Sequence, residues 1–198
     1  MIKNKILILV SPSGCGKNYV LDYLSSEYNY KSLVSHTTRD KRPKEIDHVD
    51  YHFVSTNEFL SMIDNDELIE YRTYNTLVNN IPSIWHYGLS KQTIDDLNPN
   101  TNYVTIFDVQ GAKEFIEYYG RNNCFVCMLK CDDKIREERA KSRGGFNSEE
   151  WLRRKNDDLI VFSDENTKGL VDHYITNDGT IEELEIKIKD LVDKLIEK

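Results

Sequence analysis

The sequence predicts an α/β protein with a central, mostly parallel sheet flanked by helices. One observation is that short apolar runs typical of strands alternate with patterns typical of helices, as in chains that build parallel sheets. The other is that a glycine-rich turn joins the first apolar run directly to a helical pattern at residues 19–27. The strand-like runs cover residues 5–10, 32–35, 103–108, 123–130 and 172–176.

The last segment of the chain has the clearest helical period. Its apolar side chains recur every three or four residues and Glu and Lys fill the opposite face, so we expect this helix to pack on the sheet. The apolar stripe consists of Ile181, Leu184, Ile188, Leu191, Val192 and Leu195.

A second strand-rich stretch interrupts the first pattern. Residues 51–54 and 68–75 are strand-like and enclose a short helix, whose start is marked by the capping-box pair Ser55 and Glu58. We therefore expect a mixed α/β subdomain inserted at residues 35–90. A single domain over residues 1–198 would then have a core made of residues 1–34, 91–133 and 163–198.

Length and composition exclude several classes of protein. A chain of 198 residues suits one compact unit with small insertions. The longest apolar run, residues 6–10, is too short to cross a bilayer, and no signal-peptide pattern follows it. A net charge of −8 argues against a dedicated nucleic-acid binder, which needs a broad basic face. We expect a cytoplasmic protein without nucleic-acid or membrane partners.

The four cysteines raise the question of a metal site, because Cys124, Cys127 and Cys131 are close in sequence. Residues 124–129 have the pattern of a buried strand, in which side chains three apart point to opposite faces. Reduced thiols in a cytoplasmic enzyme explain the cysteines better than a metal site does. Cys15 lies in the glycine-rich turn, where a small side chain is needed.

Residues 11–18, which we call the glycine loop, have the sequence Ser-Pro-Ser-Gly-Cys-Gly-Lys-Asn. In a P-loop, glycines let backbone N–H groups turn toward phosphate oxygens, and the lysine reaches the outer phosphates. The strict pattern has glycine where this chain has Ser11, and Ser or Thr where it has Asn18. Asn18 offers a carbonyl oxygen to Mg²⁺, directly or through water. The alternative is an ordinary glycine-rich turn that contains a lysine.

Asp108 ends the apolar run at residues 103–108. This arrangement brings a carboxylate to the C-terminal edge of the sheet, near the metal of a P-loop site. Alone, such an aspartate is more often a helix N-cap or a turn residue. Together with the glycine loop, it favours a phosphate and metal site.

Residues 35–45, Ser-His-Thr-Thr-Arg-Asp-Lys-Arg-Pro-Lys-Glu, are followed by Asp-Tyr-His-Phe-Val at residues 50–54. This segment resembles the signature of the guanylate kinase family, Ser-x-Thr-Thr-Arg-x-x-Arg-Pro-x-Glu leading into Asp-Tyr-x-Phe. Further landmarks follow in the family's order, and the resemblance runs from Ile6 to the C-terminal helix. They are residues 67–71, 87–88, 108–111, 139, 142–144, 154 and 177–178.

The resemblance implies a P-loop kinase that transfers phosphate from ATP to GMP or dGMP with Mg²⁺. It implies that Arg39, Arg42 and Tyr51 hold the acceptor phosphate, and that a second group recognises the guanine base, namely Ser35, Glu70 and Asp108. A carboxylate suits the adjacent N–H and NH₂ donors of guanine, and guanidinium groups suit a phosphate dianion. The alternative for the basic stretch is a solvated loop. The implied GMP-binding residues are Ser35, Arg39, Arg42, Glu45, Tyr51, Glu70, Tyr87 and Asp108.

The resemblance also implies a helical lid at residues 134–162, whose arginines neutralise the transferring phosphoryl group. These arginines are Arg139, Arg143 and Arg154. Arginines on such a charged helix otherwise pair with neighbouring glutamates, and we expect at least one of these three to have only a structural role. The implied ATP-binding residues are Ser13, Gly14, Cys15, Gly16, Lys17, Asn18, Arg143 and Asn177. The implied catalytic residues are Lys17, Arg39, Arg139 and Arg154, and the implied metal ligands are Asn18 and Asp108.

Two departures from the family pattern bear on the acceptor. Leu89 stands where the family usually has Ser or Thr near the guanine oxygen, which removes one contact to the base. Residues 76–86 form a longer connection than the family's, with Ile81, Pro82, Ile84 and Trp85 in it. An extended loop here either covers the acceptor site, mediates a subunit contact, or is an insertion without a role.

Two rival functions stay open at this stage. One is a kinase with another acceptor nucleotide, suggested by Leu89 and the long connection. The other is a non-catalytic interaction module of the same family, against which the intact Gly14, Gly16 and Lys17 argue. The expected partners are small nucleotides, and the expected assembly is a monomer or a homodimer.

Overall fold

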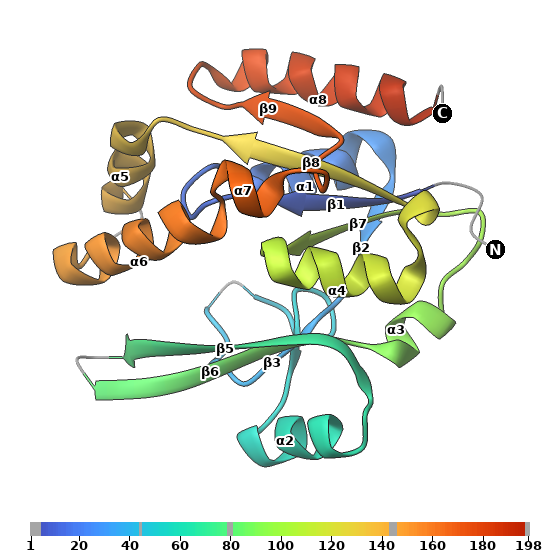
Figure 1. Cartoon of the computed structure of the whole chain (residues 1–198), viewed down its shortest axis with the longest axis vertical. Helices are drawn as coiled ribbons and strands as arrows, with labels where there is room; N and C mark the ends of the chain where they lie inside the picture. The colour runs from blue at the N-terminus through green and yellow to red at the C-terminus, as the bar shows by residue number, and fades with distance from the viewer. Residues whose placement is uncertain (1–4, 44, 79–80, 143–145, 197–198) are drawn as a thin grey trace. The chain divides into compact units, whose positions relative to one another are not determined.

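The computed structural model describes residues 5–43, 45–78, 81–142 and 146–196 (Figure 1). The chain divides into two compact units. The first consists of Met1–Ser32 with Pro99–Lys198, and the second of Leu33–Asn98. The second unit extends beyond residues 35–90 at both ends: it begins at Leu33, and at its other end it includes the short helix α3 (Lys91–Asp95).

The first unit is built on a five-stranded sheet in the order β2-β7-β1-β8-β9. All neighbouring strands in it are parallel. The central strand β1 (Ile6–Val10) is completely buried, which fits its continuous apolar sequence. The others are β2 (Tyr30–Ser32), β7 (Asn102–Phe107), β8 (Cys124–Lys130) and β9 (His173–Thr176).

The prediction of a strand at residues 32–35 is wrong. The strand instead ends at Ser32, and its buried residue is Tyr30, which pairs with Asn102. Tyr30 packs in the core of the first unit, whereas the chain from Leu33 onward belongs to the second. The burial of the Tyr30 ring therefore determines where this strand lies. The sequence pattern does not reveal the strand, because Tyr28 and Tyr30 stand on either side of a polar turn.

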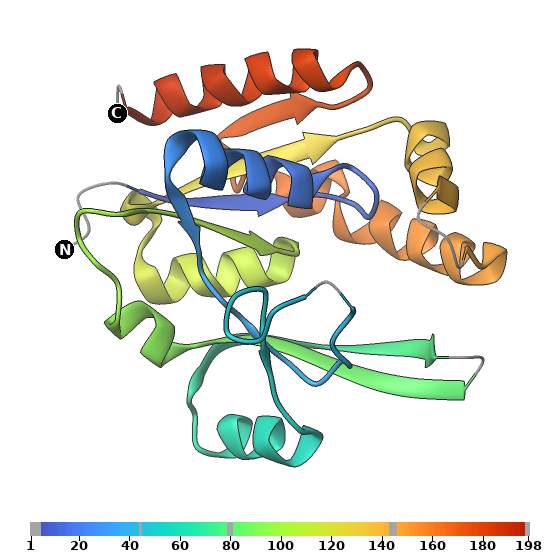
Figure 2. The same cartoon turned by 180° about the vertical axis from the view of Figure 1, so that it is seen from behind.

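Helices cover both faces of this sheet. Figures 1 and 2 show α1 (Lys17–Tyr28) and α4 (Val109–Tyr119) on opposite faces. The C-terminal helix α8 (Ile181–Ile196) buries Leu184, Ile188, Leu191 and Val192, as the stripe predicts. Ile181 is 56% exposed because it lies at the first position of the helix. The remaining elements are α5 (Asp133–Ser142), α6 (Ser148–Val161), α7 (Asp164–Thr167) and the 3₁₀ turn η1 (Arg121–Asn123).

The second unit holds a four-stranded mixed sheet in the order β4-β3-β6-β5. Its elements are β3 (His36–Thr37), β4 (His52–Phe53), β5 (Leu68–Val78), β6 (Ile81–Ser90) and α2 (Thr56–Asp64). The capping box predicted for α2 is confirmed: the Ser55 hydroxyl accepts from the Glu58 N–H, and the Glu58 carboxylate accepts from the Ser55 N–H.

The long connection at residues 76–86 is not an irregular loop. Strands β5 and β6 pair antiparallel as far as Val78 and Ile81, so the inserted residues extend a hairpin. Among the described residues of the insertion, pairing between the two strands supplies partners for backbone groups. Ile81, Pro82 and Ile84 are exposed on it, as expected, whereas Trp85 is half-buried. Within the described part of the chain, no helix is long and apolar enough to cross a membrane.

Three histidines meet where β3 pairs with β4. His36 and His52 are register partners with ring centroids 4.6 Å apart, and the Nδ1 atoms of His48 and His52 are 2.7 Å apart. Burial, together with the neighbouring His52, lowers the pKa of His36 to about 4. A proton on His36 is therefore disfavoured in the folded state.

We expect the protein to lose stability as the pH falls from about 6.5 to about 4. In this window the unfolded chain binds a proton at His36 that the folded chain does not, so acidification favours unfolding. Urea unfolding at several pH values between 7.5 and 4.5 measures the slope. His36→Asn should make the slope shallower, and equal slopes in both proteins would contradict the role of His36.

Candidate active site

The glycine loop lies where the fold predicts a ligand site for parallel sheets, beyond the carboxyl ends of the strands. It begins after Val10 at the end of the central strand β1, and α1 starts at Lys17. Strand β7 runs alongside, with Phe107 opposite Val10. Asp108 therefore follows β7 at the same edge of the sheet at which the loop begins.

Two glycines give the loop its shape. Gly14 has φ +85° and Gly16 has φ +94°, both in the region that side-chain-bearing residues rarely adopt. A Cβ on Gly16 would lie 2.6 Å from the side-chain nitrogen of Asn177. The buried Asn177 side chain donates to the Cys15 carbonyl at 2.9 Å, so an amide that follows β9 holds the loop backbone. Asn177, predicted to bind ATP, thus contacts the loop directly.

The Lys17 ammonium group points back across the start of the loop. It donates to the Ser11 carbonyl at 2.6 Å, to the Ser11 hydroxyl at 3.0 Å and to the Pro12 carbonyl at 3.2 Å. The predicted loop lysine is therefore held over the loop by neutral oxygens, which an incoming phosphate oxygen can replace with a charged partner. Asn18 follows on the first turn of α1 with an exposed side chain.

Asp108 is the N-cap of α4: its Oδ1 accepts from the Gly111 N–H at 2.7 Å. The cap was the alternative interpretation of this residue, and the structure shows that it is satisfied. A cap and a metal contact do not exclude each other, because a carboxylate has a second oxygen. The roles of Asp108 toward the metal and toward the base stay predictions.

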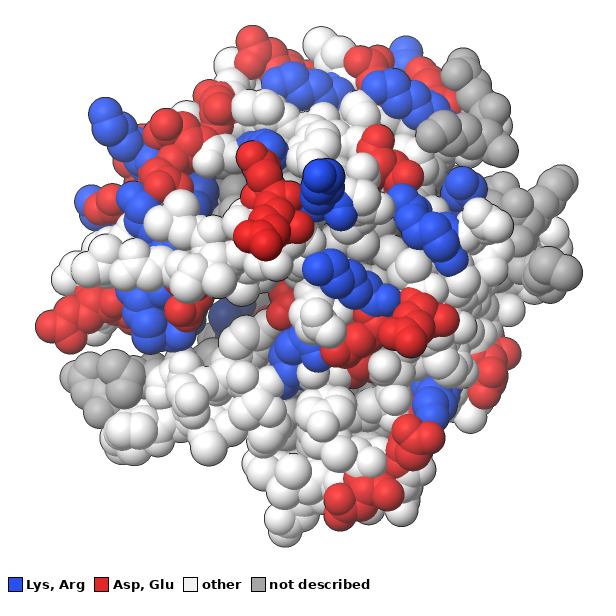
Figure 3. Space-filling model, viewed as in Figure 1, with Lys and Arg blue, Asp and Glu red and all other residues white. Residues whose placement is uncertain are grey.

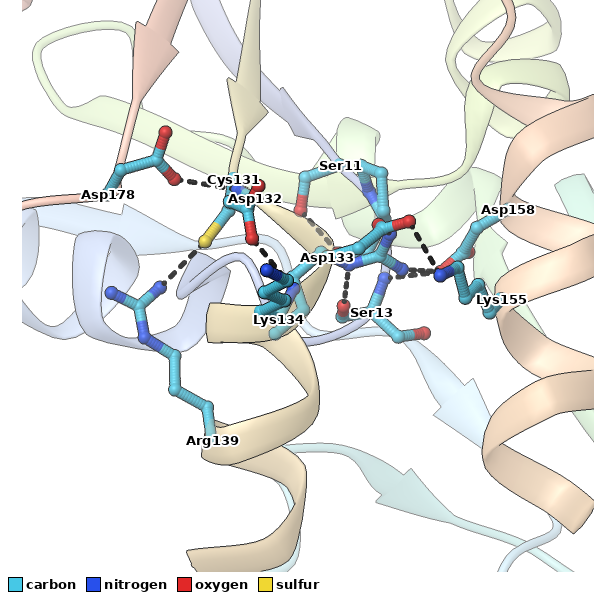
Figure 4. Close-up of polar contacts among 12 residues, drawn as sticks. Ser11, Ser13, Cys131, Asp132, Asp133, Lys134, Arg139, Lys155, Asp158 and Asp178 are labelled. Carbon is cyan, nitrogen blue, oxygen red and sulfur yellow. Dashed lines mark hydrogen bonds and ion pairs between the residues drawn. The ribbon is translucent and has the colours of Figure 1, made fainter. Parts of the chain in front are cut away.

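The arginines predicted for the lid lie in different surroundings. Arg139, on α5, donates to the Cys131 sulfur at 3.4 Å (Figure 4). It also donates to the Asn177 carbonyl at 3.1 Å. Arg154, on α6, is 45% exposed and pairs with Glu150 at 2.7 Å, as the alternative for a charged helix expects. Arg143 lies outside the described residues. Arg139 is therefore built into the loop's support, and Arg154 lies on the helix surface.

Arg136 and Asp158 are the residues at this site that sequence reasoning missed. The Arg136 Nε donates to the Ser13 carbonyl at 2.7 Å, and the Asp158 Oδ2 accepts from the Ser13 N–H at 3.0 Å. The two side chains also form an ion pair with each other. Each sits in a run of charged residues on a helix, and no spacing marks it, so only the fold reveals the contact.

In the second unit, the predicted phosphate residues gather around Arg39, which is buried. Its two terminal nitrogens grip Glu45 at 2.8 and 2.9 Å, Nη1 also donates to the Asp40 carbonyl, and Nε donates to the Tyr87 hydroxyl. Burial alone would lower the pKa of Arg39, but the bonds to Glu45 and Tyr87 raise it above its usual value. The Arg39 bond in turn lowers the pKa of Glu45. Both groups are ionised.

The N–H groups of the Arg39 guanidinium face the Glu45 carboxylate and not the open surface. Among the described residues, Glu45, Asp40 and Tyr87 take four of the five N–H donors that a guanidinium has. Arg42 differs, because 68% of its side chain is exposed and its Nη1 lies 3.9 Å from the Glu45 carboxylate, which only the Arg42 backbone N–H approaches closely, at 2.8 Å. Arg42 is thus better placed than Arg39 to offer a bidentate contact.

Two tyrosines line the same cluster. The rings of Tyr51 and Tyr87 meet edge to face at 5.9 Å, and the Arg39 guanidinium lies 5.4 Å from the centre of the Tyr51 ring. Burial raises the pKa of Tyr51. Its hydroxyl therefore stays protonated at neutral pH and can donate a hydrogen bond to a phosphate oxygen. The structure brings Arg39, Arg42, Glu45, Tyr51 and Tyr87 together.

Glu70 is a buried carboxylate on β5, 6% exposed. Its Oε1 accepts from the Leu89 N–H at 3.0 Å, across the β5–β6 pairing. The Leu89 side chain is fully buried, so this residue contributes to the site through its backbone N–H. The Ser35 carbonyl accepts from the His52 N–H at 2.9 Å and fixes the start of β3.

A five-stranded parallel sheet, with a lysine-bearing glycine loop between its central strand and the next helix, defines the class of P-loop kinase folds. The guanylate kinase family model matches residues 3–194. The guanylate kinase of Mycoplasmoides gallisepticum is 32% identical over 97% of this chain and 94% of its own length. That of Rickettsia bellii is 31% identical over 90% and 89%. The crystal structure of guanylate kinase from Anaplasma phagocytophilum has a TM-score of 0.59 and 25% identity, covering 96% of this chain and 85% of that one.

The chain therefore belongs to the guanylate kinase family. This membership confirms the family resemblance of the signature segments and the predicted fold class. Members of the family are nucleoside-monophosphate kinases.

We expect Gly16→Ala to destabilise the protein by more than Gly169→Ala, its matched control. Both glycines have positive φ, which costs an alanine about 1–2 kcal/mol, but only Gly16 has an atom within 4 Å of the added methyl. Gly16→Ala should also weaken ATP binding, because Asn177 must move. Urea unfolding and ATP titration measure both effects. Equal losses in the two variants would mean that the Asn177 contact does not constrain the loop.

Proposed function

We propose that this chain transfers the γ-phosphate of ATP to GMP or dGMP, giving GDP or dGDP. The observation that carries the proposal is the lysine-bearing glycine loop at the end of the central strand, in a chain of the guanylate kinase family. The donor phosphates would bind the loop N–H groups and Lys17, with Asn177 holding the loop. Glu70 and Arg42 with Tyr51 would supply base and phosphate recognition on the acceptor side.

No general base is needed for this reaction, because the acceptor phosphate is already a nucleophile at neutral pH. Catalysis then consists of positioning and charge neutralisation. Lys17 would neutralise the transferring phosphoryl group, and Arg139 would act from α5, where its contacts with Asn177 hold it beside the loop support. Arg154 reaches the same group only if it leaves Glu150.

We infer that Mg²⁺ accompanies ATP. The carboxamide oxygen of Asn18 and the carboxylate of Asp108 are hard donors of the kind that Mg²⁺ prefers, and both follow strand ends or helix starts at one sheet edge. Among the described residues, no group of three His, Cys, Asp or Glu side chains could hold a metal alone. Mg²⁺ bound through substrate phosphates and one or two protein oxygens would neutralise charge on the transferring group.

A cytoplasmic setting is our further inference. The cysteines are free thiols, three of them buried, as in proteins kept in a reducing compartment. Figure 3 shows Lys and Arg interspersed with Asp and Glu over one face, and the described side chains there form no broad basic surface. A small anionic substrate held by local cations fits this surface better than a nucleic acid does.

We expect Lys17→Met to reduce turnover by about a thousandfold or more while the fold persists. The substitution removes the ammonium group at the loop but leaves the apolar stem, and the lost bonds are to neutral oxygens at the loop's own start. A coupled assay for ADP release, with circular dichroism as the folding control, measures the effect. Near-normal turnover in a folded Lys17→Met protein would contradict the donor site.

Glu70→Gln should lower kcat/KM for GMP by about 100-fold or more and leave ATP affinity nearly unchanged. Glutamine keeps an Oε1 for the Leu89 N–H, but it loses the charge that pairs with the guanine donors. GMP and dGMP should lead an acceptor panel that includes AMP, CMP, UMP and dTMP. Glu67→Gln, an exposed change near the start of the same strand, is the control. A pyrimidine nucleotide that outperforms both guanine nucleotides would overturn the acceptor assignment but not the kinase.

A further inference from the structure

We propose that Asp158 is a resident anion of the glycine loop: its carboxylate holds a loop N–H and the Arg136 guanidinium in the positions that the donor phosphates take over when ATP binds. Arg136 then becomes an additional phosphate-binding residue of the kinase. The inference rests on the proposed role of the glycine loop as the donor site.

Both backbone polar groups of one loop residue, Ser13, are bonded to this pair. The Ser13 N–H donates to the Asp158 Oδ2 at 3.0 Å, and the Ser13 carbonyl accepts from the Arg136 Nε at 2.7 Å. The Arg136 Nη2 pairs with that same Oδ2. One carboxylate oxygen therefore has a loop N–H and a guanidinium N–H as donors, and this donor set is the one that P-loop sites offer to a phosphate oxygen.

The pair is buried at the loop. Side-chain exposure is 4% for Arg136 and 12% for Asp158, and Figure 4 shows Ser13, Asp158 and Asp133 gathered beside the loop. Burial raises the pKa of Asp158 above its usual range, although Ser13, Arg136 and Lys17 oppose the rise. The partners thus do not fully compensate the carboxylate for its lost hydration. An anion with more charge and more oxygens can replace it.

Arg136 has anchors that do not depend on Asp158. Its Nη1 pairs with Asp133 at 2.7 Å, its Nε keeps the Ser13 carbonyl, and its guanidinium lies 5.6 Å from the centre of the Trp151 ring. Lys155, one turn before Asp158 on α6, also pairs with Asp133. When Asp158 leaves, Arg136 therefore stays beside Ser13, with Nη2 available to a phosphate oxygen.

The exchange would also act on the helix that carries Asp158. Helix α6 belongs to the predicted lid, and its Asp158 contacts Ser13 of the glycine loop and Arg136 on α5. Replacement of this contact by phosphate releases one attachment of α6 to the loop. Binding of ATP and movement of the lid would then both break the bond between Asp158 and the Ser13 N–H, so the two events would be coupled.

The test compares binding of ATP and of tripolyphosphate to the full chain carrying Asp158→Asn or Asp158→Ala. Both variants remove the competing charge, and asparagine keeps an oxygen for the Ser13 N–H. We expect the Kd for both ligands to fall by about tenfold. Asp157→Asn is the matched control, because it removes the same charge from the adjacent, exposed position, where Asp157 pairs with Arg153. Its Kd should stay within about twofold of the unmodified protein.

The role of Arg136 is tested in the Asp158→Ala background. There, Arg136→Met should raise the Kd for ATP and for tripolyphosphate by about tenfold or more relative to Asp158→Ala alone. An ion pair that serves only as a clamp predicts no change, because its partner is already gone. In the unmodified protein, added tripolyphosphate should shift the Ser13 amide resonance and the Arg136 Nε resonance, which needs no variant to fold.

Unchanged or weaker ATP binding in folded Asp158→Asn, or resonances of Ser13 and Arg136 that do not respond to tripolyphosphate, would overturn the inference. If Lys17→Met still abolishes ATP binding in that case, the proposed donor site stands and only Asp158 is misassigned. If ATP binding is indifferent to Lys17 as well, both proposals fail.

Discussion

The position of the glycine loop depends on the pairing of β1 on both its edges. Strands β7 and β8 flank it in parallel, and the five residues of β1 are fully shielded from solvent. A strand fixed on both sides brings the start of the glycine loop to one place at the sheet edge, beside the ends of its neighbours. Phe107 lies opposite Val10 and Met128 opposite the same residue on the other side, so Asp108 and the chain after β8 reach the loop by register alone.

From that edge, a chain of contacts shapes the loop. Asn177 follows β9, and its backbone N–H donates to the Lys130 carbonyl at the end of β8. Its side chain then reaches the Cys15 carbonyl, and its own carbonyl accepts from Arg139. A residue that sequence analysis associates with the donor nucleotide is thus also a structural brace. Mutating Asn177 would change loop geometry and nucleotide contact together, and loss of ATP binding alone could not separate the two.

The sequence was sufficient for the elements whose signals are local. The parallel strands, the α2 capping box and the buried side of α8 follow from periodicity and from Ser55 and Glu58, because neighbours in sequence determine them. Residues 76–86 resemble a loop in the sequence, since Pro82 and polar residues interrupt the alternation, but the described residues of this stretch belong to the β5–β6 hairpin. Antiparallel pairing between strands is not visible in one strand's composition.

The residues of the candidate site also differ in whether the sequence predicts them. Lys17, Asp108 and Arg39 can be named from the sequence because a spacing or a signature marks them. Arg136 and Asp158 could not, because their meeting at Ser13 joins residues 123 and 145 positions away from the loop. Tertiary contacts over such separations depend on how α5 and α6 pack after β8, which no local pattern specifies. The ion pair between Arg39 and Glu45 could not be predicted either: the signature contains both residues, but it does not show that they bind each other.

Each unit holds a buried arginine paired with an internal carboxylate: Arg39 with Glu45 in one, and Arg136 with Asp158 in the other. The bidentate grip on Arg39 lowers the pKa of Glu45, whereas burial raises the pKa of Asp158. The Arg39 pair thus stabilises its charges, while the carboxylate of the Arg136 pair is poorly compensated. Replacing Glu45 by a phosphate would therefore cost more free energy than replacing Asp158. We interpret Arg39 as a group that orients Tyr51 and Tyr87 beside Arg42, and Arg136 as a group that is positioned to bind a ligand. In an acidic chain of net charge −8, such pairs keep arginines in place before any substrate arrives.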